Sequence, residues 1–444
     1  MKKYSHIVRH SGNLPLFDIL DISVAGTLTG TPVHVHAEGL RGTGKTTIIR
    51  AFKEVLPKIN RIRDCLYNCD PEKPHCPQHR NLTPQQVRLI GVEQIDMPFL
   101  EISHSAKKGT VVGSIDLQKI SSKDNPEAAL LLGTIPKAHR GIIFVDEINR
   151  IADTSPEIVD LLLDVMGTKP GRIQIEEAGF PVLEMPVQVS IWAASNPDEE
   201  PGPLEDVRRQ LSDRFDFAVR VERPANPWII KKIIGGDTPA HDNDVVSKKR
   251  MQFLEVQKTI HQFEPTEDII NILSSMYVDF GIESLRCIEA CLLGIKIRSA
   301  LLKQKPTTDD VVYISKFALR HRVNIKELNS ILTNLEKRQS SKEEVTSKAN
   351  PSIEQTCKAK NTSKGVKTLK DKNQNASTYN LESFKNIFQR LAENFKSSKS
   401  ERTNRSTSNF HSENYNVKAP PKKAVPIDKL DLTEYVKTEE ELMR

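Results

Sequence analysis

Residues 39–46, Gly-Leu-Arg-Gly-Thr-Gly-Lys-Thr, fit the pattern G-x-x-x-x-G-K-[ST]. Residues 31–38 before them alternate apolar and polar side chains in the manner of a strand, and residues 46–55 after them read as a helix that stops at Pro57. A glycine-rich turn in this setting lets backbone N–H groups converge on phosphate oxygens without clashes from Cβ atoms. The motif therefore constrains this part of the chain to a phosphate-binding unit of strand, loop and helix.

Two side chains of this loop have specific roles in phosphate chemistry. Lys45 would reach the β and γ phosphates of a nucleotide, and the Thr46 hydroxyl would bind Mg²⁺. We therefore expect ATP and Mg²⁺ as cofactors. The residues predicted to surround the nucleotide are Gly39, Leu40, Arg41, Gly42, Thr43, Gly44, Lys45 and Thr46.

A second element, GIIFVDE at residues 141–147, is an apolar strand that ends in two acids. Asp146 would hold the Mg²⁺ ion, and Glu147 would polarise the attacking water. Two acids after a strand can also serve only as a helix N-cap. Because the P-loop lies about a hundred residues upstream, hydrolysis is the favoured role.

Two later polar residues complete the candidate site. Asn196 follows the predicted strand 189–194 and would hydrogen-bond the γ-phosphate or the water, although an Asn before a Pro also starts turns. Arg214 follows a polar turn and would reach the γ-phosphate of a neighbouring subunit; a solvated surface charge is the alternative.

The order of predicted elements indicates the fold class. Strands alternate with helices up to about residue 225, and residues 128–137 are predicted as one of those helices, so we expect an α/β parallel sheet flanked by helices. Residues 1–225 would form the nucleotide-binding core, and the segment at about 172–188 within it reads as a hairpin. Residues 226–335 read as a separate, all-helical domain.

Residues 336–444 form a polar tail that is predicted to be largely disordered. The tail holds 22 Lys plus Arg against 15 Asp plus Glu, whereas residues 1–335 hold 42 against 43. The net charge of +6 is therefore a property of the tail. A basic arm can bind nucleic acid, but a solvated linker is the favoured reading and no nucleic-acid partner is expected. Apolar residues at helical spacing predict a partner-docking helix over 381–396.

An irregular loop at residues 60–83 carries clustered sulfur and imidazole ligands. Cys65, Cys69, Cys76 and His79 supply enough soft ligands for a tetrahedral Zn²⁺ site or an iron–sulfur centre. Uncoordinated thiols in a surface loop are the alternative. Six cysteines in 444 residues do not make a disulfide scaffold.

The chain has no apolar run near the roughly 20 residues that a membrane span needs, and its basic start lacks the apolar segment of a secretory signal. A cytoplasmic location is the expectation.

The order of these motifs resembles that of the AAA+ ATPases, and several stretches resemble the magnesium chelatase I subunit family. These stretches are VHAEGLRGTGKTTIIRAF, KKGTVVGSIDLQKI, AHRGIIFVDEINRI, VDLLLDV, WAASNPDEE and VRRQLSDRFDF. The resemblance implies that Asn196 is the sensor 1 residue and Arg214 the arginine finger. It also implies that 173–187 is the hairpin inserted before sensor 1 and that 111–120 belongs to the insertion in the second helix.

The resemblance also implies that residues 1–225 are an ATPase core and that the all-helical domain is its lid. In this lid, residues 284–289 (SLRCIE) resemble the S-x-R-x-x-E opening of the sensor 2 helix in this clade and in the related minichromosome maintenance helicases. Arg286 is therefore the sensor 2 candidate. Arg298 is the fallback, and a purely structural arginine is the alternative.

The resemblance implies a function and an assembly. The chain would be an ATP-hydrolysing motor that forms a homo-oligomeric ring, expected to be a hexamer. It would drive metal insertion into a tetrapyrrole through a partner subunit with a von Willebrand A domain. The alternative is a MoxR-type remodelling ATPase acting on a protein complex with such a partner.

Overall fold

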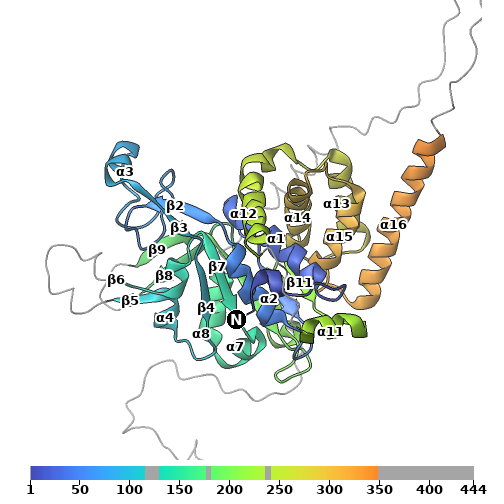
Figure 1. Ribbon diagram of the computed structural model, residues 1–444, viewed down its shortest axis with the longest axis horizontal. Helices are drawn as coiled ribbons and strands as arrows, with labels where there is room; N and C mark the ends of the chain where they lie inside the picture. Colours follow the sequence, from blue (N-terminus) through green and yellow to red (C-terminus); the bar gives the residue numbers. More distant parts are fainter. Residues whose placement is uncertain (1, 116–129, 177–181, 236–241, 349–444) are drawn as a thin grey trace, which may run out of the picture. The chain divides into compact units, whose positions relative to one another are not determined.

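The computed structural model describes residues 2–115, 130–176, 182–235 and 242–348 (Figure 1). The predicted docking helix at 381–396 lies outside these residues, as does the tail from residue 349 onward. Among the described residues, no helix has the length and the apolar character needed to cross a membrane.

The centre of the structure is a five-stranded parallel sheet with the strand order β11-β1-β10-β7-β4. Val35 of β1 is in register with Trp192 of β10 on one side and with Phe217 of β11 on the other. This sheet confirms the predicted α/β class. Its strands are β1 (Val35–Glu38), β4 (Phe99–Ile102), β7 (Gly141–Val145), β10 (Val189–Ser195) and β11 (Phe217–Arg220).

Strands β7 and β10 are buried at every position, as expected for parallel strands with both faces covered. Successive side chains of β7 enter different cores. Ile142 and Phe144 join the core on one face of the sheet, whereas Ile143 and Val145 join the core on the other. The continuous apolar run of this strand is therefore explained by helices on both sides.

The first face is covered by α1 (Leu14–Leu28), α2 (Lys45–Ala51) and the 3-10 turn η2 (Phe52–Val55). Helix α1 is buried on nearly all sides because it lies between the sheet and the C-terminal helices. Phe52 and Trp192 meet edge to face, with ring centroids 5.7 Å apart, and Phe17 packs on Phe52 at 5.8 Å. These rings join the P-loop helix to the centre of the sheet.

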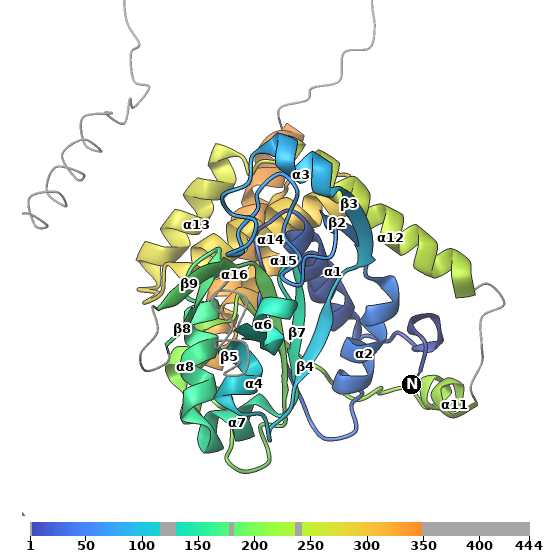
Figure 2. The same cartoon turned by 90° about the vertical axis from the view of Figure 1, so that its left-hand side faces the viewer.

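The C-terminal helices after residue 241 pack on the same face (Figures 1 and 2). Phe253, Ile295 and Ile314 from three of these helices belong to the same apolar core as Trp192 of the sheet. Because the two regions share this core, the division into an ATPase core (1–225) and a lid (226–335) stays a prediction. The helices from Pro227 onward are α11 (Pro227–Gly235), α12 (Asp242–Thr259), η4 (Ile260–Gln262), α13 (Glu267–Asp279), α14 (Arg286–Leu302), α15 (Thr308–Ala318) and α16 (Ile325–Lys348).

Helix α16 runs past residue 335, where the tail is predicted to begin, and ends at Lys348. Residues 336–348 contain neither Gly nor Pro and are rich in Glu, Lys, Arg and Gln, which favour helices. The helix therefore continues to Lys348, into the segment predicted as tail, because a low content of apolar residues does not by itself end a helix.

The second face is covered by short helices, with two small antiparallel sheets beside them. The strands β8 and β9 pair from Gly171↔Val187 to Ile175↔Leu183, at the place where the hairpin insert is expected. The elements of this side are α4 (Lys108–Val112), β5 (Gly113–Ile115), β6 (Leu130–Leu132), α6 (Thr134–Lys137), α7 (Ile148–Thr154), α8 (Pro156–Val165), β8 (Gly171–Ile175), β9 (Leu183–Val187), α9 (Leu204–Val207) and α10 (Arg209–Arg214).

The predicted helix at 128–137 is wrong over residues 130–133, and its first two residues lie outside the described part of the chain. Residues 130–132 form strand β6, which pairs with β5, and only residues 134–137 are helical. Gly133 divides the two elements: a Cβ atom there would lie 2.3 Å from the carbonyl carbon of Val112. The close approach of two backbones at this glycine prevents one continuous helix. Of the predicted insertion 111–120, residues 116–120 lie outside the described part of the chain.

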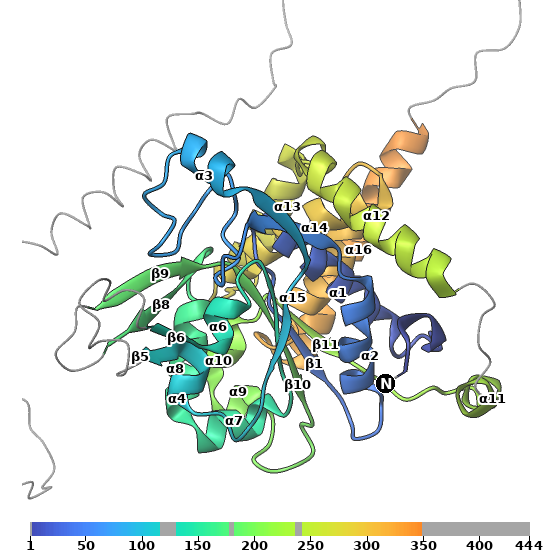
Figure 3. The ribbon, with the colours of Figure 1, turned by 60° about the vertical axis from the view of Figure 1, so that its left-hand side comes forward.

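An arm projects from the sheet between α2 and β4 (Figure 3). Its strands β2 (Lys58–Ile62) and β3 (Val92–Asp96) pair antiparallel. Helix α3 (Pro84–Ile90) has a capping box in which Thr83 and Gln86 satisfy each other's backbone N–H groups. The loop that carries the three clustered cysteines lies between β2 and α3, so only its first residues, 60–62, depart from the expected irregular structure.

Candidate functional site

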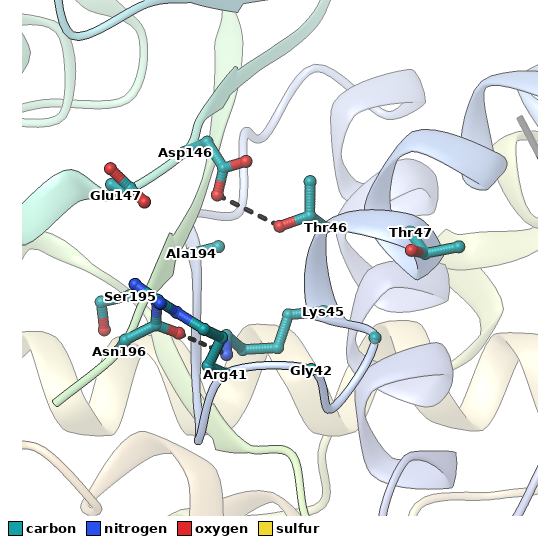
Figure 4. Close-up of a pocket in the computed structure, with 11 residues that line it drawn as sticks. Arg41, Gly42, Lys45, Thr46, Thr47, Asp146, Glu147, Ala194, Ser195 and Asn196 are labelled. Carbon is teal, nitrogen blue, oxygen red and sulfur yellow. Dashed lines mark hydrogen bonds between the residues drawn. The ribbon is translucent and has the colours of Figure 1, made fainter. Parts of the chain in front are cut away.

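The carboxyl ends of β1, β10 and β7 lie side by side because these three strands are parallel neighbours. The P-loop follows β1, Asn196 follows β10, and Asp146 with Glu147 follows β7. Together they line a cavity of about 300 Å³ (Figure 4). Its lining residues are Arg41, Gly42, Gly44, Lys45, Thr46, Thr47, Asp146, Glu147, Ala194, Ser195 and Asn196.

The P-loop needs glycine at its two ends for different reasons. Gly39 has almost no space, since a Cβ atom there would lie 2.4 Å from the carbonyl oxygen of Val221. Gly44 has open space around it, but its φ of 88° is in the left-handed region that side chains with a Cβ rarely adopt. The backbone therefore turns sharply enough to direct its N–H groups toward one point.

Lys45 is buried, with 6% of its surface exposed. Its Nζ donates to the carbonyl oxygens of Gly39 at 2.6 Å and Leu40 at 2.9 Å, and to Oδ1 of Asn196 at 2.8 Å. Burial lowers the pKa of Lys45, although the carboxylates of Asp146 and Glu199 oppose that shift. The ammonium group is thus held at the junction of the loop and β10, beside the cavity.

Thr46 and Asp146 point toward one another across the cavity (Figure 4). The Thr46 hydroxyl donates to Oδ1 of Asp146 over 3.2 Å, and Arg50 lies 3.6 Å from the same carboxylate. Burial raises the pKa of Asp146, partly offset by these two neighbours. Two hard oxygen ligands side by side suit Mg²⁺, and a bound cation would lower that pKa again.

Glu147 has a left-handed backbone, with a φ of 52°, at the turn between β7 and α7. Strained residues of this kind concentrate at functional sites. Its carboxylate lines the cavity and lies 3.2 Å from Nη1 of Arg150. A further cavity of about 560 Å³, which includes Arg50 and His104 in its lining, also reaches Asp146 and Glu147, so the two acids are accessible from two sides.

The orientation of the Asn196 amide follows from its partner. A lysine ammonium only donates hydrogen bonds, so the atom that faces Nζ of Lys45 is the amide oxygen. The amide NH₂ group is then turned away from Lys45 and can donate to a phosphate or a water. Asn149 supports this segment through hydrogen bonds to the carbonyl oxygens of Asn196 at 3.4 Å and Gly202 at 3.1 Å.

Arg214 and Arg286 are absent from the lining of this cavity. Arg214 ends α10, just before β11, and therefore lies at the amino edge of the parallel sheet, opposite the P-loop edge. Arg286 begins α14 and lies beside it, since each arginine donates to the carbonyl oxygen of Gly167 over 3.3 Å. Burial and the charge of Arg286 lower the pKa of Arg214. The structure thus pairs the two predicted arginines but separates them from their own P-loop.

The fallback residue Arg298 has structural partners. It forms an ion pair with Asp310 and lies over the ring of Tyr313, 4.5 Å from the centroid. Both contacts are within the helical region, far along the chain from the phosphate motifs. The structure therefore places Arg286, rather than Arg298, beside the other predicted arginine, Arg214.

A larger cavity of about 780 Å³ continues beyond the P-loop, and sequence reasoning missed it. Its walls come from the N-terminal segment, from Gly42 to Gly44 and from α11; in Figure 2 the start of the chain lies between α2 and α11. Ile7, Val8 and Ile230 supply apolar surface. His10 accepts a hydrogen bond at Nδ1 from the Gly12 N–H over 3.2 Å, which leaves its other ring nitrogen to donate. Apolar walls with a few polar groups suit a flat heterocycle.

A chain of buried polar contacts connects the sheet to the helical region. Nε2 of His36 lies 2.9 Å from the Ser195 hydroxyl, next to Asn196, and Nδ1 lies 3.4 Å from Glu38. Glu38 in turn pairs with Arg320 at 3.3 Å. Sequence reasoning did not identify these partners, because Arg320 is 282 residues from Glu38.

The four ligand candidates of the cysteine loop come together. One ligand atom from each of Cys65, Cys69, Cys76 and His79 lies within 4.8 Å of all the others, and the three cysteines are buried. This is the same set that the sequence predicts.

Comparison with known proteins places these features in context. No family model matches the chain. It is 28% identical over 326 residues to the magnesium-chelatase 38 kDa subunit of Acidiphilium rubrum, covering 71% of this chain and 89% of that protein. It is 27% identical over 310 residues to the magnesium-chelatase subunit ChlI of Trieres chinensis, covering 66% and 82%. A ChlI homolog of Methanocaldococcus jannaschii is 25% identical over 314 residues, covering 67% and 80%.

Two solved structures are also similar. A cryo-EM-based description of the complex between subunits BchI and BchD of magnesium chelatase has 26% identity, 74% and 98% coverage of the two chains and a TM-score of 0.41. A putative ATPase from Cytophaga hutchinsonii has 14% identity, 75% and 91% coverage and a TM-score of 0.46. The fold assignment rests on the strand order of the central sheet.

Proposed function

We propose that this chain, a relative of the magnesium-chelatase I subunits with the AAA+ order of motifs, binds and hydrolyses ATP as the motor subunit of a chelatase. The observation that carries the proposal is the convergence of Lys45, Thr46, Asp146, Glu147 and Asn196 on one cavity at the carboxyl edge of the sheet. These residues come from three strands that are separated in sequence and adjacent in space.

The two neighbouring cavities would hold different parts of the nucleotide. The adenine ring fits the apolar cavity between the N-terminal segment and α11, and the phosphates fit the P-loop, because Gly42 and Gly44 line both cavities. Thr46 and Asp146 would hold Mg²⁺, which neutralises phosphate charge when bound. Lys45 would turn its ammonium from the loop carbonyls toward the terminal phosphate.

Hydrolysis needs a water that is oriented and deprotonated. Glu147 lies next to Asp146 with its carboxylate accessible, so it can take the proton from that water. The NH₂ group of Asn196 can donate to the water or to the γ-phosphate from the neighbouring strand. This chain's own residues thereby supply the base and one donor for the developing negative charge.

The positive charge that hydrolysis also needs comes from another subunit in this proposal. Arg214 and Arg286 lie together at the opposite edge of the sheet, where they cannot reach their own cavity. In a closed ring, the heterologous contact brings one edge of a subunit to the other edge of its neighbour. Both arginines would then face the neighbour's γ-phosphate, and the ring, expected to be a hexamer, would be required for turnover.

The work done by hydrolysis would be metal insertion into a tetrapyrrole through partner subunits, one of them with a von Willebrand A domain. The link from Ser195 through His36 and Glu38 to Arg320 offers a path from the nucleotide to the C-terminal helices. A MoxR-type remodelling role is the second candidate. The relatives found carry chelatase names, which favours metal insertion.

The test uses Glu147→Gln, which should hold ATP without hydrolysing it, as bait in the cells that make the protein. We expect it to retain a von Willebrand A domain subunit together with a tetrapyrrole-binding subunit. The recovered wild-type complex should insert Mg²⁺ into a porphyrin only with hydrolysable ATP. The matched control is Glu157→Gln, an exposed residue of α8. Retention of a protein complex with no tetrapyrrole-binding component and no metal insertion would contradict the chelatase proposal and support remodelling.

A further inference from the structure

We propose that Cys65, Cys69, Cys76 and His79 bind one Zn²⁺ ion in a closed structural site. The ion would connect the β2–β3 arm to the apolar core on the second face of the sheet, which is called the second core below. This site is separate from the proposed ATP site. Among the described residues these four form the group whose ligand atoms all lie within 4.8 Å of one another.

The spacing of the ligand atoms suits one tetrahedral ion. With Zn–S bonds of about 2.3 Å and Zn–N bonds of about 2.0 Å, the ligand atoms of such a site lie roughly 3.5–3.8 Å apart. Sγ of Cys76 and Nδ1 of His79 are 3.2 Å apart, and no pair in the group exceeds 4.8 Å. Small shifts therefore complete a Cys₃His site with no open position, which is the structural type of zinc site.

The backbone around the sulfurs is arranged for thiolates. The N–H of Cys69 donates to Sγ of Cys65 over 3.4 Å, and the N–H groups of His75 and Cys76 both donate to Sγ of Cys69 over 3.4 Å. A neutral thiol accepts hydrogen bonds only weakly, whereas a metal-bound thiolate is stabilised by such donors. Three backbone N–H groups thus point at two of the sulfurs, Sγ of Cys65 and Sγ of Cys69, which is the arrangement that supports metal-bound thiolates.

Residues outside the ligand set hold the loop in this shape. Asn68 adopts a left-handed φ of 51° between two of the cysteines, and its side chain donates to the carbonyl oxygen of Lys137 over 2.8 Å. His75 lies 3.3 Å from Sγ of Cys69 and stacks on His139, with ring centroids 3.7 Å apart. These contacts orient the loop independently of any ion.

A basic side chain also lies beside the loop. Three thiolates and one imidazole around Zn²⁺ carry a net charge of −1. The largely buried guanidinium of Arg140 lies next to the loop and pairs at 3.2 Å with Asp70, the residue after Cys69. An iron–sulfur cluster is less suitable, since such clusters are held by four cysteines or, in Rieske centres, by two histidines and two cysteines.

The position of the loop indicates what the ion does. Arg140 and His139 immediately precede β7, so the loop packs at the start of the strand that leads to Asp146. The loop is therefore at the edge of the sheet opposite the nucleotide cavity. We infer that the ion stabilises the arm and the second core, and that it takes no part in hydrolysis.

Metal analysis of the full-length protein, purified with a non-chelating reductant, tests the site. We expect about one Zn²⁺ per chain in the wild type and in Cys357→Ser, the control at a cysteine of the tail, and a loss of at least fivefold in Cys76→Ser. Lys45→Ala should keep its zinc, so failure of the ATPase proposal would leave this result intact. Absence of stoichiometric metal from the wild type, or iron with sulfide in its place, would overturn the inference.

A spectroscopic measurement covers the case in which Cys76→Ser does not fold. Replacing the ion in the wild type with Co²⁺ should give the intense visible bands of a tetrahedral site and sulfur-to-cobalt charge transfer in the near ultraviolet. His79→Cys should keep stoichiometric Co²⁺ and strengthen the charge-transfer band. A Co²⁺ spectrum of octahedral type, with the three loop thiols free to react with a thiol reagent, would contradict a Cys₃His site.

Discussion

Nζ of Lys45 donates a hydrogen bond to Oδ1 of Asn196 over 2.8 Å and thereby connects the P-loop to the end of β10. The contact joins two residues 151 positions apart in sequence. Because it occupies the amide oxygen of Asn196, it leaves the NH₂ group to act on the nucleotide. The two residues should therefore have separable effects.

Lys45→Ala removes the ammonium that balances phosphate charge and should weaken ATP binding by at least about tenfold. Asn196→Ala leaves Lys45 with its two loop carbonyls, so ATP affinity should change by only a few fold while turnover falls by about tenfold to a hundredfold. Titration with a fluorescent ATP analogue and steady-state turnover measure the two effects. Equal loss of affinity in both variants would contradict this division of roles.

The pairing of Arg214 with Arg286 predicts complementation between subunits. Arg214→Ala and Lys45→Ala should each be nearly inactive, since one lacks the finger and the other lacks the phosphate site. Mixing them in equal amounts before ring assembly should restore about a quarter of the wild-type rate, because one interface in four then combines two intact halves. Arg88→Ala, on the exposed side of α3, is the control. If mixing restores nothing, Arg214 does not act on a neighbour.

Helix α11 forms one wall of the larger cavity, so a substitution on that wall should weaken the binding of the adenine ring. Ile230 lines the larger cavity, whereas Trp228 on the same helix does not and is 65% exposed. Ile230→Asp should weaken ATP binding by roughly tenfold, about 1.4 kcal/mol, and Trp228→Asp should have little effect. Tripolyphosphate, which lacks the base, should bind equally to both variants and to the wild type. A reduced affinity for tripolyphosphate in Ile230→Asp would contradict the proposal that Ile230 acts through the adenine base.

The buried side chain of His34 should make the free energy of unfolding depend on pH. Burial lowers its pKa to about 3, with Lys169 and Arg286 acting in the same direction and Asp216 opposing them. The unfolded value is about 6.5, so between these values only the unfolded chain binds the proton. Stability should fall as the pH drops below about 6.5, at up to about 1.4 kcal/mol per pH unit for this residue.

His34→Asn tests this effect because the amide can still accept the hydrogen bond that Nδ1 of His34 receives from the Ile191 N–H. The free energy of unfolding in urea, measured from pH 7 to pH 5, should depend less steeply on pH in this variant than in the wild type. His104→Asn, at an exposed position, is the control for the removal of an imidazole. An unchanged slope in His34→Asn would show that His34 does not titrate as proposed.

The P-loop, the pair of acids at Asp146 and the sensor candidate Asn196 share one property: each directly follows the end of a strand. A motif such as residues 39–46 marks the end of its own strand, and parallel pairing then brings Asp146 and Asn196 to the same edge. Local spacing likewise identified the four residues of the cysteine loop, because all four lie within 15 residues. No long-range information was needed in either case.

The parts that could not be predicted depend on packing between distant segments. The apolar cavity combines Ile7 and Val8 with Ile230, which lies more than 200 residues away. The position of Arg286 beside Arg214 depends on how α14 docks on the first face of the sheet. Neither relation leaves a periodicity or a motif in the sequence, so only the folded chain reveals them.

The hydrolysis rate of Glu147→Gln tests the central claim most directly. The amide keeps the size of the carboxylate but cannot accept the proton of the water. We predict that ATP affinity stays within a few fold of the wild type while turnover falls at least about a hundredfold. Turnover at the wild-type rate in this variant, or a wild-type protein that hydrolyses ATP no faster than Lys45→Ala, would contradict the assignment of an ATPase.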